Sequence, residues 1–480
     1  MKETDDLAHR LARYALWLEF EHLPPAVVHE VKRRVIDTVG CTLGAYAAEP
    51  CKAARAVALE LGREPEASVI GSPVATSMDL AAMANGVAVR YLDFNDTYLS
   101  LEPAHPSDNI PAALAVAEAG GRSGKDLIAA IALAYEVQCR LADAASIRAR
   151  GWDHVTYGAF STALVAAKLM GLDFGRTVQA VNLAGVTSPT LRQTRAGELS
   201  MWKGAAFANS ARNGVFAALL ARHGMTGPAP IFEGEMGFFQ QVSGPFALPD
   251  ALGGEPAAGD GPAEGDGPAE GGEAAVGGAV TRFKILDSFL KRFPAEYHSQ
   301  AGIEAALELR RRGVTADQVE RMTIKTFLVG VEIIAKDPEK WHPKTRETAD
   351  HSLPYCVAAA LMDGTISPAQ FSEARITDPV IQGFLNRIAV MEDEDLTAKY
   401  PDGIPTVLEA YLKSGEVQTV RQDYPRGHFG NPMTDREVEE KFLEQTGGLL
   451  APAQRKEFLR LAWDLEHLED LGPLLAQTII

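Results

Sequence analysis

The composition of this 480-residue chain changes abruptly once, between Gly253 and Gly278. This segment consists almost entirely of Gly, Ala, Pro, Glu and Asp, and the hexapeptide Gly-Asp-Gly-Pro-Ala-Glu occurs twice in it, from Gly259 to Glu270. Such a segment cannot bury enough apolar surface to offset the entropy lost on ordering. We therefore predict a disordered linker over residues 253–280, with a globular domain on each side of it.

The part of the chain before this linker has the periodicity of helices. Apolar residues recur there at three- and four-residue spacing. Thr76 with Asp79, and Ser123 with Asp126, have the spacing of a capping box, in which each side chain bonds a first-turn amide. We predict an all-helical domain over residues 1–252.

The part after the linker mixes strands with helices. Arg321 to Phe327 alternates like a strand, and residues 406–412 and 416–420 flank Ser414-Gly415 like the arms of a hairpin. We predict an α+β domain over residues 281–424.

The end of the chain returns to a helical pattern. Thr434 with Glu437 has capping-box spacing in front of it, and we expect residues 425–480 to dock back onto the first domain. The predicted fold class is mainly α, with a large all-helical domain and a smaller α+β domain.

The charge of the chain excludes one class of partner. Its 46 Lys and Arg against 64 Asp and Glu give a formal net charge of −18, whereas nucleic-acid binding requires clustered cations that neutralise phosphates. A small anionic substrate remains compatible, because a pocket can be locally positive in an acidic protein. The sequence has no signal-peptide pattern and no apolar run long enough for a membrane span, so we expect a cytoplasmic protein.

The cysteines give no indication of a metal site. Cys41, Cys51, Cys139 and Cys356 lie far apart, with no Cys-x-x-Cys pair. There is also no glycine-rich phosphate loop in the right context and no Gly-x-Ser-x-Gly elbow. We expect no metal and no cofactor.

Polar residues with catalytic potential gather at three places in the first half. The stretch from Tyr91 to Asn109 contains Asp93, Thr97 and His105 between two Ala-rich segments. His154 stands just before a predicted helix, whose free amides attract carboxylates. Lys203 starts an almost charge-free helical run. A solvated connector with capping residues, a histidine bonded within a turn and a lysine that reaches solvent are the plain structural alternatives.

In the second half, the loop KRFPAEYHSQ offers Lys291, Arg292, Glu296 and His298. Two cations, an acid and an imidazole in one loop can bind carboxylates and move a proton. A charged surface loop explains the same residues equally well. Further on, ordinary helix capping accounts for Asp350 and Ser352.

Eight stretches along nearly the whole chain resemble the MmgE/PrpD family. They are RRVIDTVGCTLGAY, ANGVAVRYLDFNDT, HPSDN, GWDHVTYGAFSTA, WKGAAFANSARNGVFAALLARHGMTGP, FLKRFPAEYHSQAGIEAAL, KTRETADHSLPYCVAAALMDG and DYPRGHFGNPMT. The resemblance implies a larger helical domain, a smaller α+β domain, an active site in the cleft between them, and a homodimer. It also implies a pocket lined by the positions Asp93, Thr97, His105, His154 and Lys203, with the Phe-Pro-Ala loop on the other side.

The activity that the resemblance implies is elimination of water from 2-methylcitrate, giving 2-methylaconitate, in propionate catabolism. Family members that decarboxylate cis-aconitate carry a histidine directly after Phe-Pro-Ala, whereas this chain has Glu296 there. That departure favours dehydration. Decarboxylation of cis-aconitate, another lyase or epimerase reaction on a small polycarboxylate, and a non-catalytic helical binding scaffold are the alternatives.

Proton abstraction next to a carboxylate develops negative charge, which positioned cations stabilise. We expect Lys203, with Lys291 or Arg292, to supply them. His154 and His105 are the expected acid and base in either order, and His298 is a further candidate for the pair. Asp93 is expected to orient an imidazole, and Thr97 to bind a carboxylate.

Overall fold

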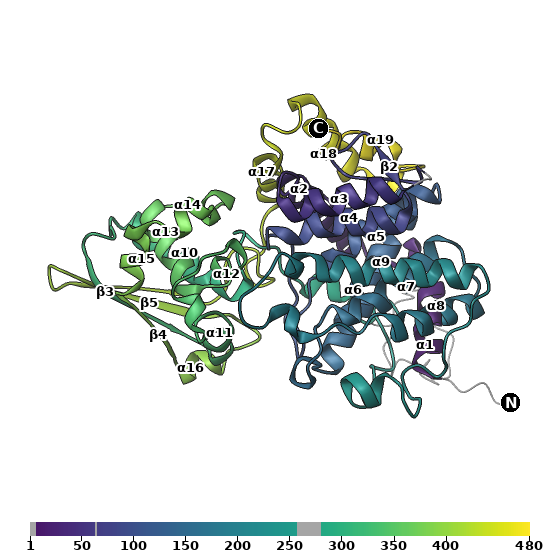
Figure 1. Ribbon diagram of the computed structural model, residues 1–480, viewed down its shortest axis with the longest axis horizontal. Helices are drawn as coiled ribbons and strands as arrows, with labels where there is room; N and C mark the ends of the chain where they lie inside the picture. Colours follow the sequence, from purple (N-terminus) through teal and green to yellow (C-terminus); the bar gives the residue numbers. More distant parts are fainter. Residues whose placement is uncertain (1–5, 63–64, 257–279) are drawn as a thin grey trace, which may run out of the picture.

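The computed structural model describes residues 6–62, 65–256 and 280–480 of the chain. Figure 1 shows two bodies side by side, a larger helical one and a smaller one that holds the main sheet. Each body has its own buried apolar core. The predicted fold class, mainly α with a smaller α+β domain, is confirmed.

Amphipathic and Ala-rich helices build the larger body. They are α1 (Leu7–Trp17), α2 (Pro25–Gly44), α3 (Glu49–Leu61), α4 (Met78–Tyr91), α5 (Ile110–Ala119), α6 (Gly124–Ala144), α7 (Thr156–Leu169), α8 (Phe174–Thr187) and α9 (Trp202–Arg222). Small residues let α9 pack closely on α7. A Cβ at Gly214 would lie 2.2 Å from Thr162 Oγ1 and 2.8 Å from the Ala159 carbonyl oxygen, so only glycine permits this approach.

The predicted capping boxes can be compared with the helix starts. Ser123 with Asp126 forms both reciprocal bonds at the start of α6. The prediction for Thr76 is wrong, because Thr76 belongs to the short strand β2 (Ala75–Thr76), which pairs with β1 (Ala67–Ser68). Ser77 is the residue that precedes α4. Among the described residues, the regular secondary structure of the larger body is therefore helical apart from the β1–β2 ladder.

The smaller body contains a four-stranded sheet in the order β4-β3-β5-β6. Its strands are β3 (Val319–Thr326), β4 (Ile388–Glu392), β5 (Thr406–Leu412) and β6 (Val417–Gln422). Only β3 and β4 pair in parallel, and β5 and β6 form the predicted hairpin. Side chains alternate along β5 between buried and half-buried, which is the pattern of a sheet with one face on a core.

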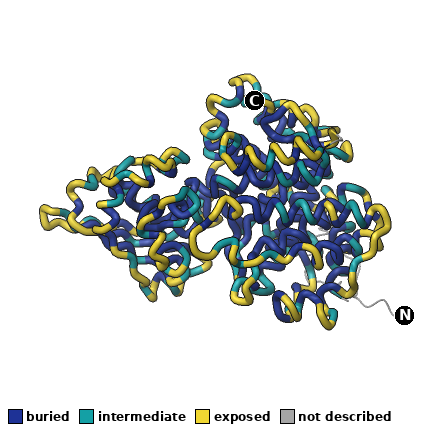
Figure 2. The backbone as a smooth tube through the Cα atoms, viewed as in Figure 1, coloured by how far each residue is buried: buried dark blue, intermediate teal, exposed yellow. Residues whose placement is uncertain are grey.

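Helices cover this core, and α10 packs directly on β5 and β6 with α13 beside it (Figure 1). The helices of the smaller body are α10 (Gln300–Arg311), α11 (Leu328–Ile334), α12 (Arg346–Ala349), α13 (Leu353–Asp363), α14 (Glu373–Ile376), α15 (Pro379–Leu385) and α16 (Glu394–Thr397). The loops that precede α10 and α13 carry residues to the boundary between the bodies, where Figure 2 shows mainly buried residues.

The last helices, α17 (Asp435–Thr446), α18 (Pro452–Trp463) and α19 (Gly472–Ala476), lie against the larger body (Figure 1). Thr434 and Glu437 form the predicted capping box of α17. In the middle of α17, the Lys441 ammonium lies 2.6 Å from Asp37 of α2, and both side chains are buried. The chain thus enters the smaller body once and returns from it.

The two segments that cross between the bodies run side by side. The Leu290 amide donates to the Gly427 carbonyl oxygen over 3.1 Å. Gly427 has φ +98°, and a Cβ there would collide with the Leu290 carbonyl oxygen. Residues 281–290, predicted as part of the α+β domain, belong instead to the larger body, because Phe283, Ile285 and Leu290 lie in its core.

Of the predicted linker, residues 257–279 lie outside the described residues. The amides of Gly254 and Thr281 donate to the carbonyl oxygens of Thr281 and Glu255, each over 2.9 Å. The Gly253 amide donates to Glu136 over 2.8 Å. The linker prediction is therefore too wide, since residues 253–256 and 280 belong to the described fold. Within the described ranges, no helix combines the length and apolar character that a membrane span requires.

Candidate active site

A cavity of about 380 Å³ lies between the two bodies. Both bodies contribute titratable side chains to its wall. The larger body supplies Arg90, Asp93, Thr97, Leu99, Glu102, Pro103, His105, Arg148, His154, Arg192, Arg195, Ala196, Gly197 and Leu199. The smaller body supplies Glu296, His298, Glu332, Ile333, Asp337, Lys340 and His351.

Asp93 follows the end of α4 and has φ +51°, the left-handed conformation that Asp tolerates better than most residues. Its carboxylate accepts from Arg90 at 2.7 Å and from Lys203 at 2.8 Å, and it also contacts Lys291. Burial alone would raise the pKa of Asp93, but these three cations hold it well below the usual value. Asp93 is thus a permanently charged carboxylate.

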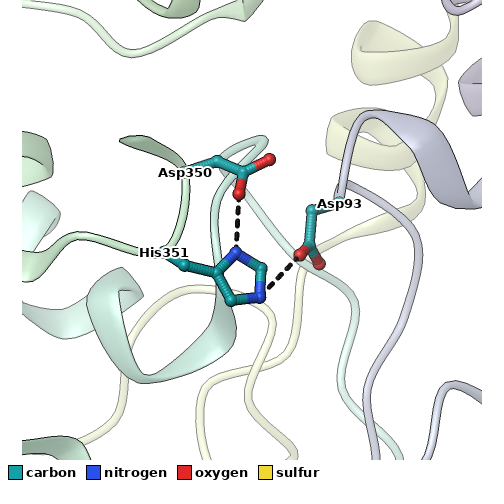
Figure 3. Close-up of side chains that lie close together, drawn as sticks. All are labelled: Asp93, Asp350 and His351. Atoms are coloured by element: carbon teal, nitrogen blue, oxygen red, sulfur yellow. Dashed lines mark hydrogen bonds and ion pairs between the residues drawn. The ribbon is translucent and has the colours of Figure 1, made fainter. Parts of the chain in front are cut away.

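Lys203 joins the two bodies from behind the cavity wall. Its ammonium lies 2.8 Å from Asp93, 3.3 Å from Asp350 and 3.2 Å from His351 Nδ1. Figure 3 shows the His351 ring between the two carboxylates, with Nδ1 2.6 Å from Asp350 and Nε2 3.5 Å from Asp93. Burial, and then Lys203, lowers the pKa of His351 to about 4.

Asp93, Asp350 and His351 are also the group of described residues whose ligand atoms lie close enough to hold a metal ion. Lys203 Nζ already contacts an atom of each residue. A metal ion at this point would have to displace the ammonium group. The group therefore fits a buried ion-pair network better than a metal centre.

His105 has both ring nitrogens engaged. Nδ1 lies 2.7 Å from the Asp96 carbonyl oxygen, which only accepts, so Nδ1 carries a proton. Nε2 then accepts from Arg90 over 2.8 Å. Burial, and then the charge of Arg90, lowers the pKa of His105 well below its usual value. His105 is therefore a neutral ring without a free lone pair for a substrate proton.

His154 presents a different environment. Its Nδ1 lies 3.3 Å from Asp153, and its buried Nε2 has no hydrogen-bond partner among the described residues. Burial lowers the pKa of His154 to about 3, against the opposing charge of Asp153. His154 is thus a neutral imidazole with an available lone pair on the cavity wall.

The smaller body places a second carboxylate–imidazole pair at the same cavity. His298 Nδ1 lies 2.7 Å from Glu296 Oε1, and Nε2 lies 3.5 Å from the Tyr400 hydroxyl. Burial alone raises the pKa of Glu296, but His298 outweighs it and lowers the pKa to about 2. A carboxylate only accepts hydrogen bonds, so His298 Nδ1 donates to Glu296, and this contact fixes the orientation of the ring.

Two models of one protein family match this chain. The MmgE/PrpD N-terminal domain matches residues 9–249, and the MmgE/PrpD C-terminal domain matches residues 293–466. The chain belongs to the MmgE/PrpD family. This family is enzymatic, so the chain is an enzyme rather than a non-catalytic helical scaffold.

Relatives of this MmgE/PrpD chain include two activities. It is 30% identical to the 2-methylcitrate dehydratase of Cupriavidus necator and 28% identical to that of Escherichia coli K12, in each case over 91% of this chain and 89% of the relative. It is also 26% identical to human cis-aconitate decarboxylase, over 95% of this chain and 91% of the relative.

The predicted residues of this MmgE/PrpD site occupy three different positions. Those that line the cavity are Asp93, Thr97, His105, His154, Glu296 and His298. Lys203 and Lys291 lie behind it and hold Asp93. Arg292 does not line this cavity and contributes instead to a separate groove with Glu304 and Arg426, so its prediction as a substrate-binding residue is not supported by its position.

Asp93 was expected to orient an imidazole, and the imidazole that it contacts is His351, at 3.5 Å. One finer expectation needs correction. Asp350 does not cap α13, because Ser352 accepts from the Tyr355 amide there. The buried Asp350 instead binds Lys203 and His351.

Sequence reasoning also missed the cavity's cations. Arg195 lies 3.0 Å and Arg192 3.6 Å from the buried Asp153, and Arg148 and Lys340 complete the set with Arg90. Arg192 and Arg195 are the first and last residues of a 3-10 helix (Arg192–Arg195) between α8 and α9, which is too short to show a helical periodicity. The sequence offers one indication of these arginines, which is that a segment rich in charged residues separates two apolar helices.

Proposed function

We propose that this chain is a 2-methylcitrate dehydratase, a hydro-lyase that eliminates water to form 2-methylaconitate without a metal ion. The observation that carries the proposal is the pair of carboxylate-bound imidazoles, Asp153–His154 and Glu296–His298, at one cation-lined cavity. Elimination requires one group that accepts a proton and one that donates a proton. Two imidazoles, one from each body, each oriented by a carboxylate, meet that requirement.

His154 is the proposed base. Its neutral ring and free Nε2 allow it to take the carbon-bound proton next to a carboxylate. Arg195 and Arg192 lie beside Asp153, the partner of His154, and line the cavity. They stabilise the negative charge that develops on the substrate carboxylate. His105 serves as a fixed neutral neighbour, since its ring lies 5.7 Å from that of His154.

His298 is the proposed acid. Its proton goes to the departing hydroxyl group as the carbon–oxygen bond breaks, so the products are water and the unsaturated acid. Glu296 stabilises the imidazolium before transfer. Thr97, whose Oγ1 lies 3.1 Å from His105 Nδ1, remains a proposed carboxylate ligand on the opposite wall.

The choice of dehydration over decarboxylation rests on two observations. The position after Phe-Pro-Ala holds Glu296, which is bound to His298 rather than replaced by a histidine. The dehydratases of Cupriavidus necator and Escherichia coli K12 are also more similar to this chain than the human decarboxylase is.

The purified protein, treated with a chelator, should convert 2-methylcitrate with a rise in ultraviolet absorbance from the new double bond. Mass analysis of the product separates loss of water from loss of carbon dioxide. Absence of turnover, or turnover that depends on added iron, would falsify the proposal. Carbon dioxide release from cis-aconitate as the main reaction would assign the decarboxylase activity instead.

His154→Gln and His298→Gln should each lower kcat by about 100-fold or more, as expected for positioned acid–base groups. His467→Gln is the matched control, because His467 also pairs with a carboxylate, Asp464 at 2.7 Å, but on the surface. An unchanged rate in either site variant removes that histidine from the mechanism.

A further inference from the structure

One buried lysine of the cavity has no counter-charge in contact with it. Of the buried lysines in the described ranges, Lys203 and Lys291 hold Asp93, and Lys441 holds Asp37. Lys340 is 4% exposed, yet its ammonium makes no hydrogen bond or ion pair with any described residue. It closes the short 3-10 turn Pro338–Lys340 and lines the cavity from the smaller body.

This position is energetically unfavourable for an empty site. The ammonium opens to the cavity rather than being sealed in the protein, but the burial of most of the residue removes part of its hydration and no ion pair replaces it. Burial, and then the charge of Lys203, lowers the pKa of Lys340, while the charges of Asp350, Asp337 and Glu296 oppose this. Energetically unfavourable groups in folded proteins cluster at active sites and ligand-binding sites.

The cations that the larger body contributes to the cavity indicate which charged groups such a ligand must have. Arg192 and Arg195 face the cavity from the larger body, and Arg148 beside them also makes no side-chain ion pair among the described residues. A molecule with a single carboxylate satisfies only one wall. A polycarboxylate satisfies both.

We infer that Lys340 binds a carboxylate of the substrate and that this ion pair links the smaller body to a tricarboxylate held by the arginines of the larger one. This inference deepens the proposed function and rests on it. Lys340 would thus be the residue that selects for a second carboxylate on the substrate. It lies outside the eight sequence stretches that resemble the family.

Tricarballylate, a tricarboxylate without a hydroxyl group to eliminate, is the probe. Its affinity should be measured by calorimetry for the wild type, Lys340→Met and Lys340→Arg. Lys336→Met is the matched control, since Lys336 is exposed on the same segment and does not line the cavity. We expect Lys340→Met to weaken binding by about 10- to 100-fold, the effect of losing one charged hydrogen bond. Lys340→Arg should retain most of the affinity, and the control all of it.

The melting temperature without ligand gives a second readout. If Lys340 stabilised the fold, its replacement would lower the melting temperature. We expect Lys340→Met to melt at the same temperature as the wild type or higher, because the change removes an unpaired charge. Affinity of Lys340→Met within twofold of the wild type overturns the inference, and so does a clear fall in melting temperature.

Failure of the proposed function has a different signature. If tricarballylate binds through Lys340 but 2-methylcitrate is not dehydrated, the inference stands and the proposed reaction is wrong. If 2-methylcitrate is dehydrated and Lys340→Met leaves its KM unchanged, the reaction stands and the inference is wrong.

Discussion

Asp93 is the residue on which the buried charges of the site converge. Three cations from three segments, Arg90, Lys203 and Lys291, meet at one carboxylate. Together with Asp350, the group has more positive than negative side chains before any substrate enters. A site with this balance is prepared for an anionic ligand, because the cost of desolvating the cations is met during folding.

Lys203→Met tests whether this network supports catalysis from behind the cavity wall. Among the described residues, the change leaves the buried Asp350 with His351 as its remaining ion-pair partner, and it removes one partner of Asp93. We expect kcat to fall by about 100-fold or more and the free energy of unfolding to fall by about 3–5 kcal/mol.

Lys52→Met is the control for Lys203→Met, because Lys52 is an exposed lysine of α3. Enzyme assays and urea unfolding measure the two effects. Wild-type activity in Lys203→Met would exclude the network from the mechanism.

The buried histidines make stability depend on pH. His154 has a pKa of about 3 when folded, against about 6.5 when unfolded. The unfolded chain therefore binds more protons below pH 6.5, so this stability is complete above pH 6.5 and is lost as the pH falls toward 3. Unfolding free energies measured from pH 6 to 4 should decline less steeply in His154→Gln, by about 1.4 kcal/mol per pH unit.

His467→Gln is again the control, because the His467 side chain is 69% exposed. Its stability should follow the wild-type pH profile. Equal slopes in His154→Gln and the wild type would show that His154 takes up its proton without unfolding the site.

The site residues differ in how readily the sequence alone identifies them. Lys203 stands out because the helix it starts is almost free of charge, and His154 because it precedes a helix start. The sequence could not identify Lys340 as a site residue, because Lys336 and Lys344 flank it in the same polar segment. Its burial is a product of tertiary packing that no local pattern encodes.

At the scale of elements, helix α17 holds two loops of the site in place from outside the cavity, the loops of Phe94 and Lys291. Lys441 donates to the carbonyl oxygens of Phe94 and Lys291 over 2.7 and 2.9 Å, besides pairing with Asp37. Those two residues adjoin or hold Asp93. The end of the chain thus supports the site although it does not reach the cavity.

Lys441→Met leaves Asp37 buried without its partner, and we expect a loss of about 3–5 kcal/mol of stability by chemical denaturation. Lys456→Met in α18 is the control, since Lys456 is exposed. A loss below about 1 kcal/mol would mean that solvent reaches Asp37 once the lysine is gone.

Elements with a strong period were predictable, and short ones were not. The β5–β6 hairpin follows from alternation on both sides of Ser414-Gly415. The strand that contains Thr76 has two residues and no period of its own, so its hydroxyl was mistaken for a cap. Thr76 donates instead to the Ala58 carbonyl oxygen.

For the whole molecule, the position of the cavity predicts how a ligand changes dynamics. The walls come from both bodies, so a bound polycarboxylate should protect amides on both sides. Hydrogen exchange with and without tricarballylate should slow at residues 190–199 and 336–341 together. Residues 413–416, at the far hairpin turn, serve as the internal reference. Protection on one side alone would contradict binding across the two bodies.

The paired crossing segments at Leu290 and Gly427 have a consequence for biosynthesis. The larger body contains residues from both ends of the chain, with the smaller body threaded between them. On the ribosome, its α2 helix must wait for Lys441 to emerge before Asp37 gains its partner. The core of the smaller body is contiguous in sequence and ends at Val420, before Lys441 is translated. The half of the enzyme that is translated first is therefore the half that is completed last.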